Sequence, residues 1–578
     1  ERMRIKSSGS IYPVNSIQGT YFGQDAGNPA NVTGVGNTSI GYATGQLLTS
    51  GYQNVSVGRS ANEKLTTGYN NVSVGTNAGY NNVDGLQNTY IGTAAGYTSP
   101  GQNYNTFVGY EAGHLNEANE NTAVGRLALT ANTTGGYNTA IGTQALTNNT
   151  TQEKLTALGY RSGYYWTGGN ENTFIGYHAG FGSAAGSTGG ENTLVGSLAG
   201  ANTSAITGNG NTSLGRYTLF SLTDGAFNTA LGHQAGGTIS TGDSNTLVGK
   251  NAGDSIGGGS RNSMLGQSAG QAITSGSDNI GIGYEALYNV TTGGSGTIAI
   301  GAISLYSFTG SRTIAIGYGA GRLLASAIDN VFIGQQAGEL RTGGIDNTAV
   351  GAFSQYGGTS GSNPSGCCNS SFGRATLYSI TVGVQNTAIG RQAGYHITNG
   401  YNNTLVGHNT ALAMVGGYDN TCIGSAAGDI LTSGYNNTCI GYNSDTPSNS
   451  STNTVVLGNT AISSLQCQVQ TISALSDERD KTNIKDSNYG LNLIDSLRPV
   501  TFEWNQRDGN KTGKKDLGFI AQDLQKVNDE HLDLINDENP EKLLASYGRL
   551  IPVLVKSIQE LKEDNDSLKA RIETLENK

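Results

Sequence analysis

Residues 88–96 read NTYIGTAAG, and variants of this nine-residue stretch recur through most of the chain. The copies NTFVGYEAG at 105–113 and NTFIGYHAG at 172–180 keep the same order of residue types. Aligned on their first glycine, 26 copies run from Gly23 to Gly458, mostly 17 residues apart. A fixed period of this length is typical of a solenoid, in which each repeat forms one turn.

Three positions of the repeat accept few residue types. The residue before the glycine is Ile, Val, Leu or Phe in all 26 copies, the residue three positions after it is Ala, Ser or Thr, and the residue four positions before it is Asn in 21 copies. A short apolar strand with one inward position, a glycine bend and a small residue indicate a parallel β-solenoid. The small column indicates closely approaching backbones, and the Asn column predicts side chains that hydrogen-bond from turn to turn. We therefore expect a mainly β shaft of 26 turns.

The repeat offers little core to a single chain. Each turn has roughly two or three apolar side chains to offset the backbone entropy of about 17 residues. Several chains packed together would supply more, so we expect a homotrimer; a self-sufficient monomeric solenoid is the alternative. The repeat also resembles the head repeats of trimeric autotransporter adhesins, which implies trimeric β-rolls.

The chain changes character at Ser476. Residues 476–578 contain 16 Lys or Arg and 21 Asp or Glu, and the same numbers are spread over the 475 residues before them. Glycine falls from 83 residues before this point to 5 after it. We therefore predict four segments: an N-terminal segment 1–18 with a truncated start, the solenoid shaft 19–462, a linker 463–475 and a small α+β domain 476–578.

The C-terminal domain is predicted to end in a coiled coil at 554–578. Before it, YGLNLIDSLRPVTFEW at 489–504 predicts a short helix, a Pro break and a strand, and KKDLGFIAQDLQKV at 514–527 predicts a strand followed by a helix. The heptad seam consists of Leu554, Ile558, Leu561, Asn565, Leu568, Ile572 and Leu575. Ile at a with Leu at d favours two strands. We keep the expectation of a trimer because the seam is short and the shaft should dominate.

The same domain resembles a known family. SDERDKTNI at 476–484, GLNLIDSLRPVTFEW at 490–504, LGFIAQDLQKV at 517–527 and the tail 550–576 look like the C-terminal intramolecular chaperone of phage tail fibres and tailspikes. That family includes the endosialidase tailspikes and a membrane-bound eukaryotic transcription factor. The resemblance implies a domain that trimerises, guides the folding of the preceding fibre and then cuts itself off just before its first serine.

Carried to this chain, the resemblance places the cut between Leu475 and Ser476 and matches the family's catalytic Ser–Lys pair to Ser476 and Lys481. A serine hydroxyl beside its own preceding peptide bond can attack that carbonyl and form an ester that water hydrolyses. A lysine acts as the base only if desolvation favours its neutral form; otherwise it stabilises the oxyanion. Asp477 and Asp480 are candidate supporting residues, and a nearby carboxylate would keep the lysine charged. Both roles of Lys481 stay open.

The leading interpretation is a phage tail fibre or tailspike that contacts a glycan or protein receptor on the host surface. It would be synthesised in the host cytoplasm, reside in the virion and join other tail proteins through a missing N-terminal part. The net charge of −10 argues against nucleic acid as a partner. No run reaches the roughly 18 apolar residues of a membrane span, so we expect no membrane insertion. Scattered His and Cys residues predict neither a metal site nor a cofactor.

Two other classes of protein remain as alternatives. A bacterial trimeric adhesin would need a secretion signal and a membrane anchor. A glycan-degrading tailspike would need paired carboxylates, whereas the acidic residues of the shaft recur directly before the repeat Asn, as at Glu120, Glu171, Glu191, Asp278, Asp329, Asp346 and Asp419. We therefore expect enzyme activity only as single-turnover self-cleavage.

Receptor contacts, if the shaft makes them, are expected at its loop expansions. These are residues 181–190, 201–210 and 355–368. Tyr69 and Tyr401 are candidates for stacking on sugars, although such tyrosines more simply cover the neighbouring turn.

Overall fold

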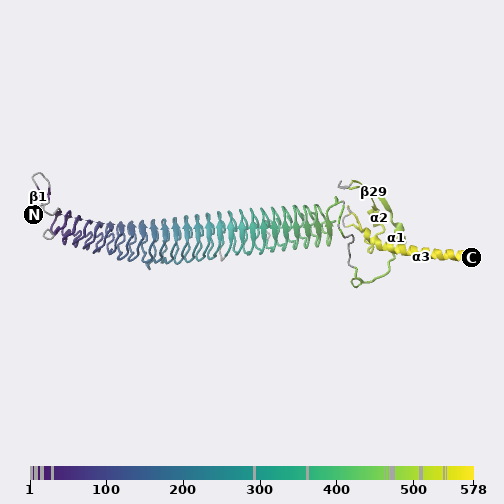
Figure 1. Cartoon of the computed structure of the whole chain (residues 1–578), viewed down its shortest axis with the longest axis horizontal. Coiled ribbons are helices and arrows are strands. Elements are labelled where there is room, and N and C mark those ends of the chain that lie inside the picture. Colours follow the sequence, from purple (N-terminus) through teal and green to yellow (C-terminus); the bar gives the residue numbers. More distant parts are fainter. Residues whose placement is uncertain are drawn as a thin grey trace. The chain divides into compact units, whose positions relative to one another are not determined.

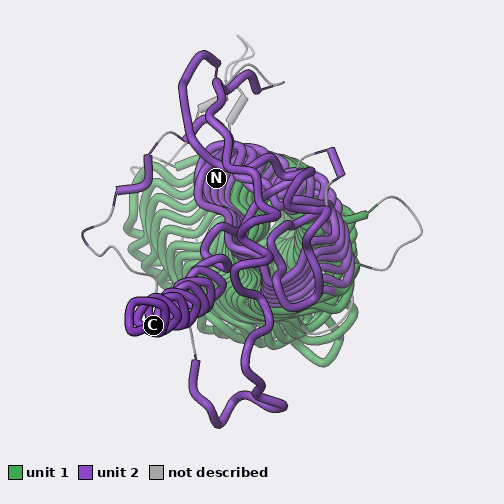
Figure 2. Tube along the Cα trace, turned by 90° about the vertical axis from the view of Figure 1, so that its right-hand side faces the viewer, with its two compact units in different colours: residues 1–365 green, residues 366–578 purple. Residues whose placement is uncertain are grey.

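The computed structural model describes residues 4–5, 11–12, 19–27, 32–290, 294–358, 364–462, 464–466, 468, 476–506, 512–537, 540–541 and 543–578. The chain divides into two compact units, residues 1–365 and 366–578 (Figure 2). Unit 1 consists mainly of stacked solenoid turns; unit 2 contains further turns and then a small domain with a long helix (Figure 1). Leu475 and most of the predicted linker 463–475 lie outside the described residues.

Each solenoid turn carries one three-residue strand. Within each unit, consecutive strands pair in parallel and in register, as Thr89, Tyr90 and Ile91 of β7 pair with Thr106, Phe107 and Val108 of β8. The strands of unit 1 are β3 (Thr20–Phe22), β4 (Thr38–Ile40), β5 (Val55–Val57), β6 (Val72–Val74), β7 (Thr89–Ile91), β8 (Thr106–Val108), β9 (Thr122–Val124), β10 (Thr139–Ile141), β11 (Thr156–Leu158), β12 (Thr173–Ile175), β13 (Thr193–Val195), β14 (Thr212–Leu214), β15 (Thr229–Leu231), β16 (Thr246–Val248), β17 (Ser263–Leu265), β18 (Ile280–Ile282), β19 (Ile298–Ile300), β20 (Ile314–Ile316), β21 (Val331–Ile333) and β22 (Thr348–Val350). Those of unit 2 are β23 (Ser370–Phe372), β24 (Thr387–Ile389), β25 (Thr404–Val406), β26 (Thr421–Ile423), β27 (Thr438–Ile440) and β28 (Val455–Leu457). Near the N-terminus, β1 (Arg4–Ile5) and β2 (Ile11–Tyr12) pair antiparallel. The predicted parallel β-solenoid is confirmed.

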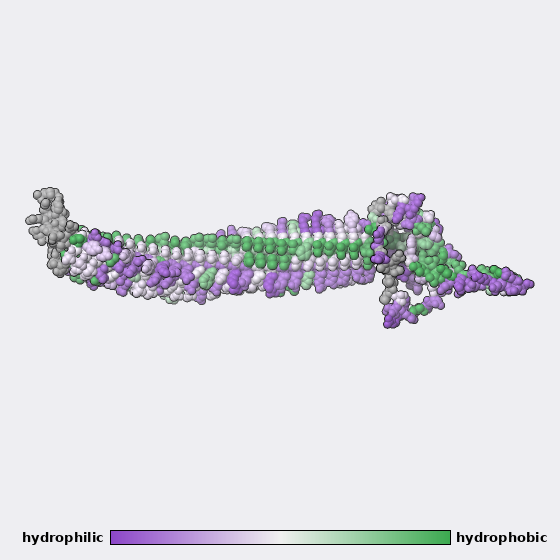
Figure 3. All heavy atoms as spheres, viewed as in Figure 1, coloured by the Kyte–Doolittle hydropathy of each residue, from purple (hydrophilic) through white to green (hydrophobic). Residues whose placement is uncertain are grey.

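The central residue of each strand points into the solenoid, and the two outer residues point out. Tyr90 and Phe107 are fully buried, whereas Ile91, the residue before the repeat glycine, is 39% exposed. The prediction of one inward position per strand is therefore confirmed, but the invariant aliphatic column faces outward. Other exposed members of this column include Leu158, Leu231 and Ile389, and Figure 3 shows hydrophobic surface that runs from turn to turn along the stack.

Three columns of side chains fill the interior. They come from the strand centre and from positions three and seven after the repeat glycine; in the turn around Gly249 they are Leu247, Ala252 and Ile256, all fully buried. Three side chains in such a turn form a narrow core, and turns with a leucine at position four, such as Leu129 and Leu146, bury a fourth. The small residue of the repeat therefore packs in this core.

The close approach of backbones lies at the repeat glycine instead. Gly75 has φ +138°, and a Cβ atom added to it would lie 2.5 Å from the carbonyl oxygen of Gly92 on the next turn. Only glycine accepts both this φ and this contact. The close approach that the sequence analysis assigned to the small column therefore occurs at the glycine column.

The Asn column forms a buried ladder of side-chain amides. Nδ2 of Asn71 donates to Oδ1 of Asn54 at 3.0 Å and to the carbonyl oxygen of Gly85 at 2.7 Å. The same Oδ1 of Asn54 also accepts from the backbone N–H of Asn71 at 3.0 Å. Asn88 repeats this pattern on Asn71. The predicted turn-to-turn hydrogen bonds of the Asn column are confirmed.

The rest of unit 2 is a small domain of short elements. They are η1 (Glu478–Asp480), α1 (Leu491–Ser496), β29 (Pro499–Asn505), β30 (Thr512–Phe519), α2 (Ala521–Gln525), β31 (Ile535–Asn536), β32 (Leu544–Ala545), η2 (Tyr547–Arg549) and α3 (Leu550–Glu576). β29 and β30 form an antiparallel hairpin, so the predicted helix, strand, strand and helix are confirmed. The small core consists of Leu524, Leu532, Leu534, Ile535, Leu550 and Val553.

Helix α3 has two functions in this domain. Its first turns bury Leu550, Val553 and Ser557, and Oε2 of Glu560 accepts the backbone N–H of Leu491 at the start of α1 at 2.7 Å. The rest of the helix carries the predicted seam, whose aliphatic members are all exposed, from 46% at Leu554 to 70% at Leu575. The described chain alone therefore leaves this seam uncovered.

Candidate functional site

Ser476 and Lys481 meet because the chain makes one tight turn between them. Asp477 caps η1: its Oδ1 accepts the backbone N–H of Arg479 at 2.9 Å. The backbone N–H of Lys481 then donates to the carbonyl oxygen of Glu478 at 3.1 Å. These bonds turn the chain back on itself, so that residue 481 faces residue 476.

The two side chains lie within hydrogen-bond distance. Nζ of Lys481 donates to Oγ of Ser476 at 2.7 Å and to the carbonyl oxygen of Ser476 at 3.2 Å. Both residues are exposed. The structure thus brings together the two residues matched to the catalytic pair, whereas Leu475, whose carbonyl would be attacked, lies outside the described residues.

The neighbouring carboxylates do not contact Lys481. Asp477 forms an ion pair with Arg479 at 2.6 Å, and the hydrogen bonds from Arg479 hold the pKa of Asp477 below its usual value. Within the described residues, the Asp480 side chain makes neither a hydrogen bond nor an ion pair. Of the two candidate supporting residues, only Asp477 therefore has a visible link to the geometry of the pair, and this link is structural.

The arrangement provides a hydroxyl nucleophile beside a basic side chain on an open surface. A neutral amine at this distance can accept the hydroxyl proton, and an ammonium can stabilise a developing oxyanion. The single described chain supplies no desolvation at the pair, because both side chains face solvent.

Several acidic residues of the shaft form ion pairs between turns. Each partner lies one turn away at the equivalent position, in Lys154–Glu171, Arg261–Asp278 and Arg312–Asp329. One pair of carboxylates also occurs: Asp445 lies beside Asp429 of the preceding turn, and burial together with this neighbour raises the pKa of Asp445 to about 6. Each tyrosine suggested for sugar stacking instead stacks on a tyrosine of an adjacent turn. The ring centres of Tyr69 and Tyr52 are 4.6 Å apart, and those of Tyr401 and Tyr418 are 4.7 Å apart. These side chains cover adjacent turns.

Two hollows escaped the sequence analysis. One, of about 370 Å³, lies on unit 1 at the turns that follow β14, β15 and β16. The other, of about 400 Å³, is an apolar groove in unit 2 between α1, the hairpin and the start of α3. Neither coincides with the loop expansions proposed from the sequence. The first hollow arises where one turn lacks a side chain, and the second where apolar residues of several elements meet. Neither can be recognised before the fold is known.

The described residues contain no group of three or more His, Cys, Asp or Glu side chains arranged to bind a metal ion. Among the helices of the described part of the chain, none combines the length and apolar character needed to cross a membrane.

Comparison with known families identifies part of the C-terminal domain. Residues 476–533 match the peptidase family described as chaperone of endosialidase. The match begins at Ser476 and includes Lys481, α1 and the β29–β30 hairpin. No curated protein and no solved structure is significantly similar to the chain.

Proposed function

We propose that this protein is a phage tail fibre or tailspike. Its C-terminal domain directs trimer assembly and then detaches by cleavage between Leu475 and Ser476, and its solenoid contacts a receptor on the host surface. The observation that carries the proposal is the family match at 476–533, which follows a long parallel β-solenoid. That combination fits a protein of the tail fibre or tailspike kind.

Trimer assembly is supported by apolar surface that one chain leaves exposed. The outward apolar column of the solenoid, which precedes the repeat glycine, includes Leu214, Leu265 and Phe372, which are 51%, 51% and 44% exposed. The α3 seam is exposed as well, and the core of the C-terminal domain is small. Burying apolar side chains against other copies contributes about 25 cal/mol for each Å² covered.

The repeat explains why assembly needs direction. Near-identical turns make a slip of one turn between chains inexpensive, because the slipped columns still match. A non-repetitive domain at one end sets the register before the solenoids pack. Its removal then leaves a fibre that is protected by its unfolding barrier.

The proposed cleavage is an intramolecular acyl transfer followed by hydrolysis. Oγ of Ser476 attacks the carbonyl carbon of Leu475, the hydroxyl proton is transferred away and the C–N bond breaks as the amine of Ser476 takes up a proton. Water then hydrolyses the ester, which leaves a carboxylate on Leu475 and restores the hydroxyl. Lys481 acts on Oγ, either as base or as a cation beside the oxyanion.

The cleavage is tested by expressing the full chain beside Ser476→Ala and a control, Ser487→Ala. Denaturing gels and intact mass should show a fragment ending at Leu475 for the wild type and the control, and only full-length chain for Ser476→Ala. A wild-type chain that stays whole after assembly would contradict the proposal.

Lys481→Arg separates the two roles of the lysine. Arginine keeps the positive charge but does not act as a base in proteins. A variant that still cleaves assigns a cationic role to Lys481. Loss of cleavage in Lys481→Arg, together with a wild-type cleavage rate that rises with pH, assigns the role of base.

Receptor contact is tested separately with the mature fibre. Binding of the fluorescently labelled fragment to host cells should saturate and should block phage adsorption. A folded trimer that binds no cell of a susceptible strain would contradict this part of the proposal.

A further inference from the structure

The solenoid carries a column of side chains, many of them aromatic, at the fifth position after the repeat glycine. Rings on adjacent turns stack nearly parallel at 4.8 to 5.6 Å, in Tyr80–Tyr97, Tyr97–His114, Tyr164–Phe181, Tyr288–Tyr306 and Tyr378–Tyr395. The spacing matches the separation of about 4.8 Å between strands of adjacent turns. Where adjacent turns both carry rings, the column therefore has no gap.

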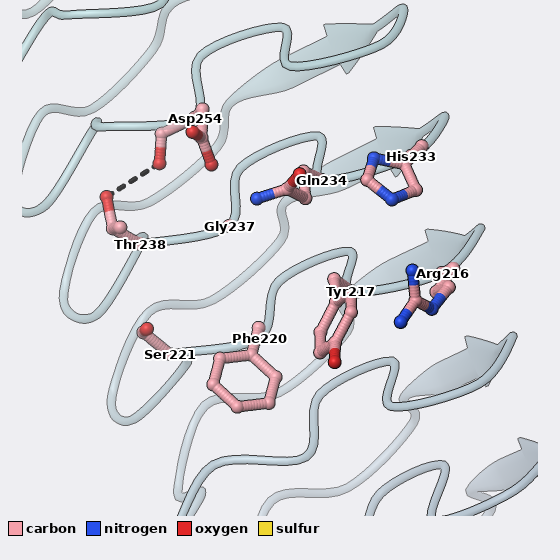
Figure 4. Close-up of a pocket in the computed structure, with 9 residues that line it drawn as sticks. All are labelled: Arg216, Tyr217, Phe220, Ser221, His233, Gln234, Gly237, Thr238 and Asp254. Atoms are coloured by element: carbon pink, nitrogen blue, oxygen red, sulfur yellow. Dashed lines mark hydrogen bonds between the residues drawn. The ribbon is translucent and has the colours of Figure 1, made fainter.

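Gly237 interrupts this column. It is the only glycine at this position in the 26 repeats. It lies between Phe220 on the preceding turn and Asp254 on the following turn, as Figure 4 shows. Its φ lies outside the left-handed region, but an added Cβ would overlap Oδ1 of Asp254, so the carboxylate must turn aside before a side chain fits. The absent side chain thus leaves a slot between Phe220 and Asp254, which lie two turns apart, and the Asp254 carboxylate reaches into it.

The slot has an aromatic wall on one side. It belongs to the hollow of about 370 Å³, a size at the lower end of known ligand sites. Its lining residues are Arg216, Tyr217, Phe220, Ser221, His233, Gln234, Gly237, Thr238 and Asp254. Tyr217 meets Phe220 edge to face at 5.4 Å, and the Arg216 guanidinium lies 4.4 Å from the Tyr217 ring centre. These contacts fix the aromatic wall in place.

The polar groups around the slot have unused hydrogen-bonding capacity. Among the described residues, the Asp254 carboxylate has no hydrogen-bond or ion-pair partner. Partial burial raises the pKa of Asp254, and the charge of nearby His233 opposes that rise. Nδ1 of His233 is buried without a partner. Thr238 donates its hydroxyl to the backbone carbonyl oxygen of Asp254 at 2.6 Å, which leaves the carboxylate free (Figure 4). A ligand in the slot would meet both donors and acceptors.

We infer that this slot binds one pyranose ring of a glycan, stacked on Phe220 in the place of the missing ring. A pyranose has apolar C–H faces and a rim of hydroxyl groups. The C–H faces would stack on the ring of Phe220, and the hydroxyl groups would hydrogen-bond with Asp254, Gln234 and Arg216. The inference rests on the proposed function, because it gives the receptor a chemical class and a place of contact.

The decisive variant is Gly237→Tyr, which refills the column with a ring and turns the Asp254 carboxylate aside. Leu412→Tyr is the matched control, because it places a ring at the same column position, one turn after Tyr395 and far along the sequence from the slot. Asp254→Asn removes a charge with almost no change of shape. Circular dichroism and analytical ultracentrifugation establish that the variants fold like the wild type.

The full chain is first screened on an array of printed oligosaccharides, and the best free oligosaccharide is then titrated by calorimetry. We expect Gly237→Tyr to weaken binding by about tenfold or more, Asp254→Asn to weaken it severalfold, and Leu412→Tyr to leave it unchanged. Retention of full affinity by folded Gly237→Tyr would overturn the inference, as would a wild-type protein that binds no glycan.

The cell-binding assay separates this failure from failure of the proposed function. Unchanged binding of Gly237→Tyr to host cells would exclude the slot as the receptor site but would still support a fibre that binds the receptor elsewhere. Absence of cell binding by the wild type would remove the proposed receptor contact itself.

Discussion

At the residue scale, one carboxylate holds the turn that brings together Ser476 and Lys481, the pair proposed for self-cleavage. Asp477 caps η1 through the backbone N–H of Arg479 and also binds its guanidinium. Neither interaction involves Lys481, yet both hold the turn that brings Lys481 to Ser476. Asp477 is therefore a positioning residue.

We expect Asp477→Ala to slow self-cleavage by about fivefold, because a lost cap costs about 1 kcal/mol and the pair would sample other geometries. Asp480→Ala serves as the control, since its side chain makes no hydrogen bond or ion pair with the described residues. The rate of fragment release after translation measures both. Equal rates for the two variants would contradict a positioning role.

The Asn ladder makes a second residue-scale prediction. Asn88 donates to Oδ1 of Asn71 at 3.1 Å and to the carbonyl oxygen of Gln102 at 2.7 Å, both in buried or partly buried surroundings. Asn88→Ala removes both bonds and also removes the Oδ1 that accepts the buried backbone N–H of Asn105 at 2.9 Å. We expect about 1 to 3 kcal/mol of destabilisation for each chain. Denaturant unfolding of the mature fibre measures it against Thr93→Ala, an exposed change on the same turn. Equal midpoints would contradict a structural role of the ladder.

Single residues differ in how far the sequence predicts them. The Asn ladder could be predicted because its residue type recurs at one position, and Ser476 with Lys481 because a family resemblance aligns them. Gly237 could not. The fifth position after the repeat glycine holds residues as different as Tyr, Phe, His, Asp and Gln. A glycine at this position therefore does not stand out until the structure shows that the rings stack.

At the element scale, α1 begins on a carboxylate from α3. The N-cap of α1 is Gly490, which has no side chain to accept a hydrogen bond, and Glu560 accepts the backbone N–H of Leu491 instead. A Cβ at position 490 would contact the Glu560 carboxylate. The glycine therefore makes room for a cap from a distant element.

We expect Glu560→Ala to destabilise the C-terminal domain by about 1 to 2 kcal/mol, and Glu560→Gln by less, because its amide oxygen can still accept. Glu563→Ala, on the exposed side of the same helix, is the control. Thermal unfolding of the full chain carrying Ser476→Ala, which keeps the domain attached, provides the measurement. A normal melting temperature for Glu560→Ala would contradict the capping role.

The period of the solenoid could be predicted from the sequence, whereas the orientation of its strands could not. The invariant position before the repeat glycine attracts attention, yet it faces outward, and the inward residue varies from Ala230 to Phe174. A narrow core tolerates different side chains as long as neighbouring turns compensate. An outer surface that packs against identical copies has a reason to stay uniform.

At the scale of the whole molecule, the C-terminal domain is proposed to set the register of the shaft. We expect residues 1–475 expressed alone to give monomers and aggregates, and the full chain carrying Ser476→Ala to give an uncut trimer. Analytical ultracentrifugation and limited proteolysis distinguish these products. A soluble, protease-resistant trimer formed by 1–475 would show that the shaft aligns itself. Trimer assembly stays a prediction because it depends on contacts between chains. The boundary at 475/476 stays a prediction because Leu475 lies outside the described residues.

The Asn ladder has one further consequence, because within a continuous run each Oδ1 faces the following turn. From Asn386 to Asn437, Nδ2 of each Asn donates one hydrogen to Oδ1 of the preceding Asn and the other to a carbonyl oxygen of the following turn. Oδ1 of Asn437 accepts the backbone N–H of Thr454 at 3.1 Å. The dipoles of strands alternate and largely cancel, but those of aligned side-chain amides add and polarise one another. Each continuous run therefore has two different ends: its last Asn offers Oδ1 as an acceptor to the turn that follows, as Asn437 does to Thr454, whereas the side chain of its first Asn offers only donors to the turn before.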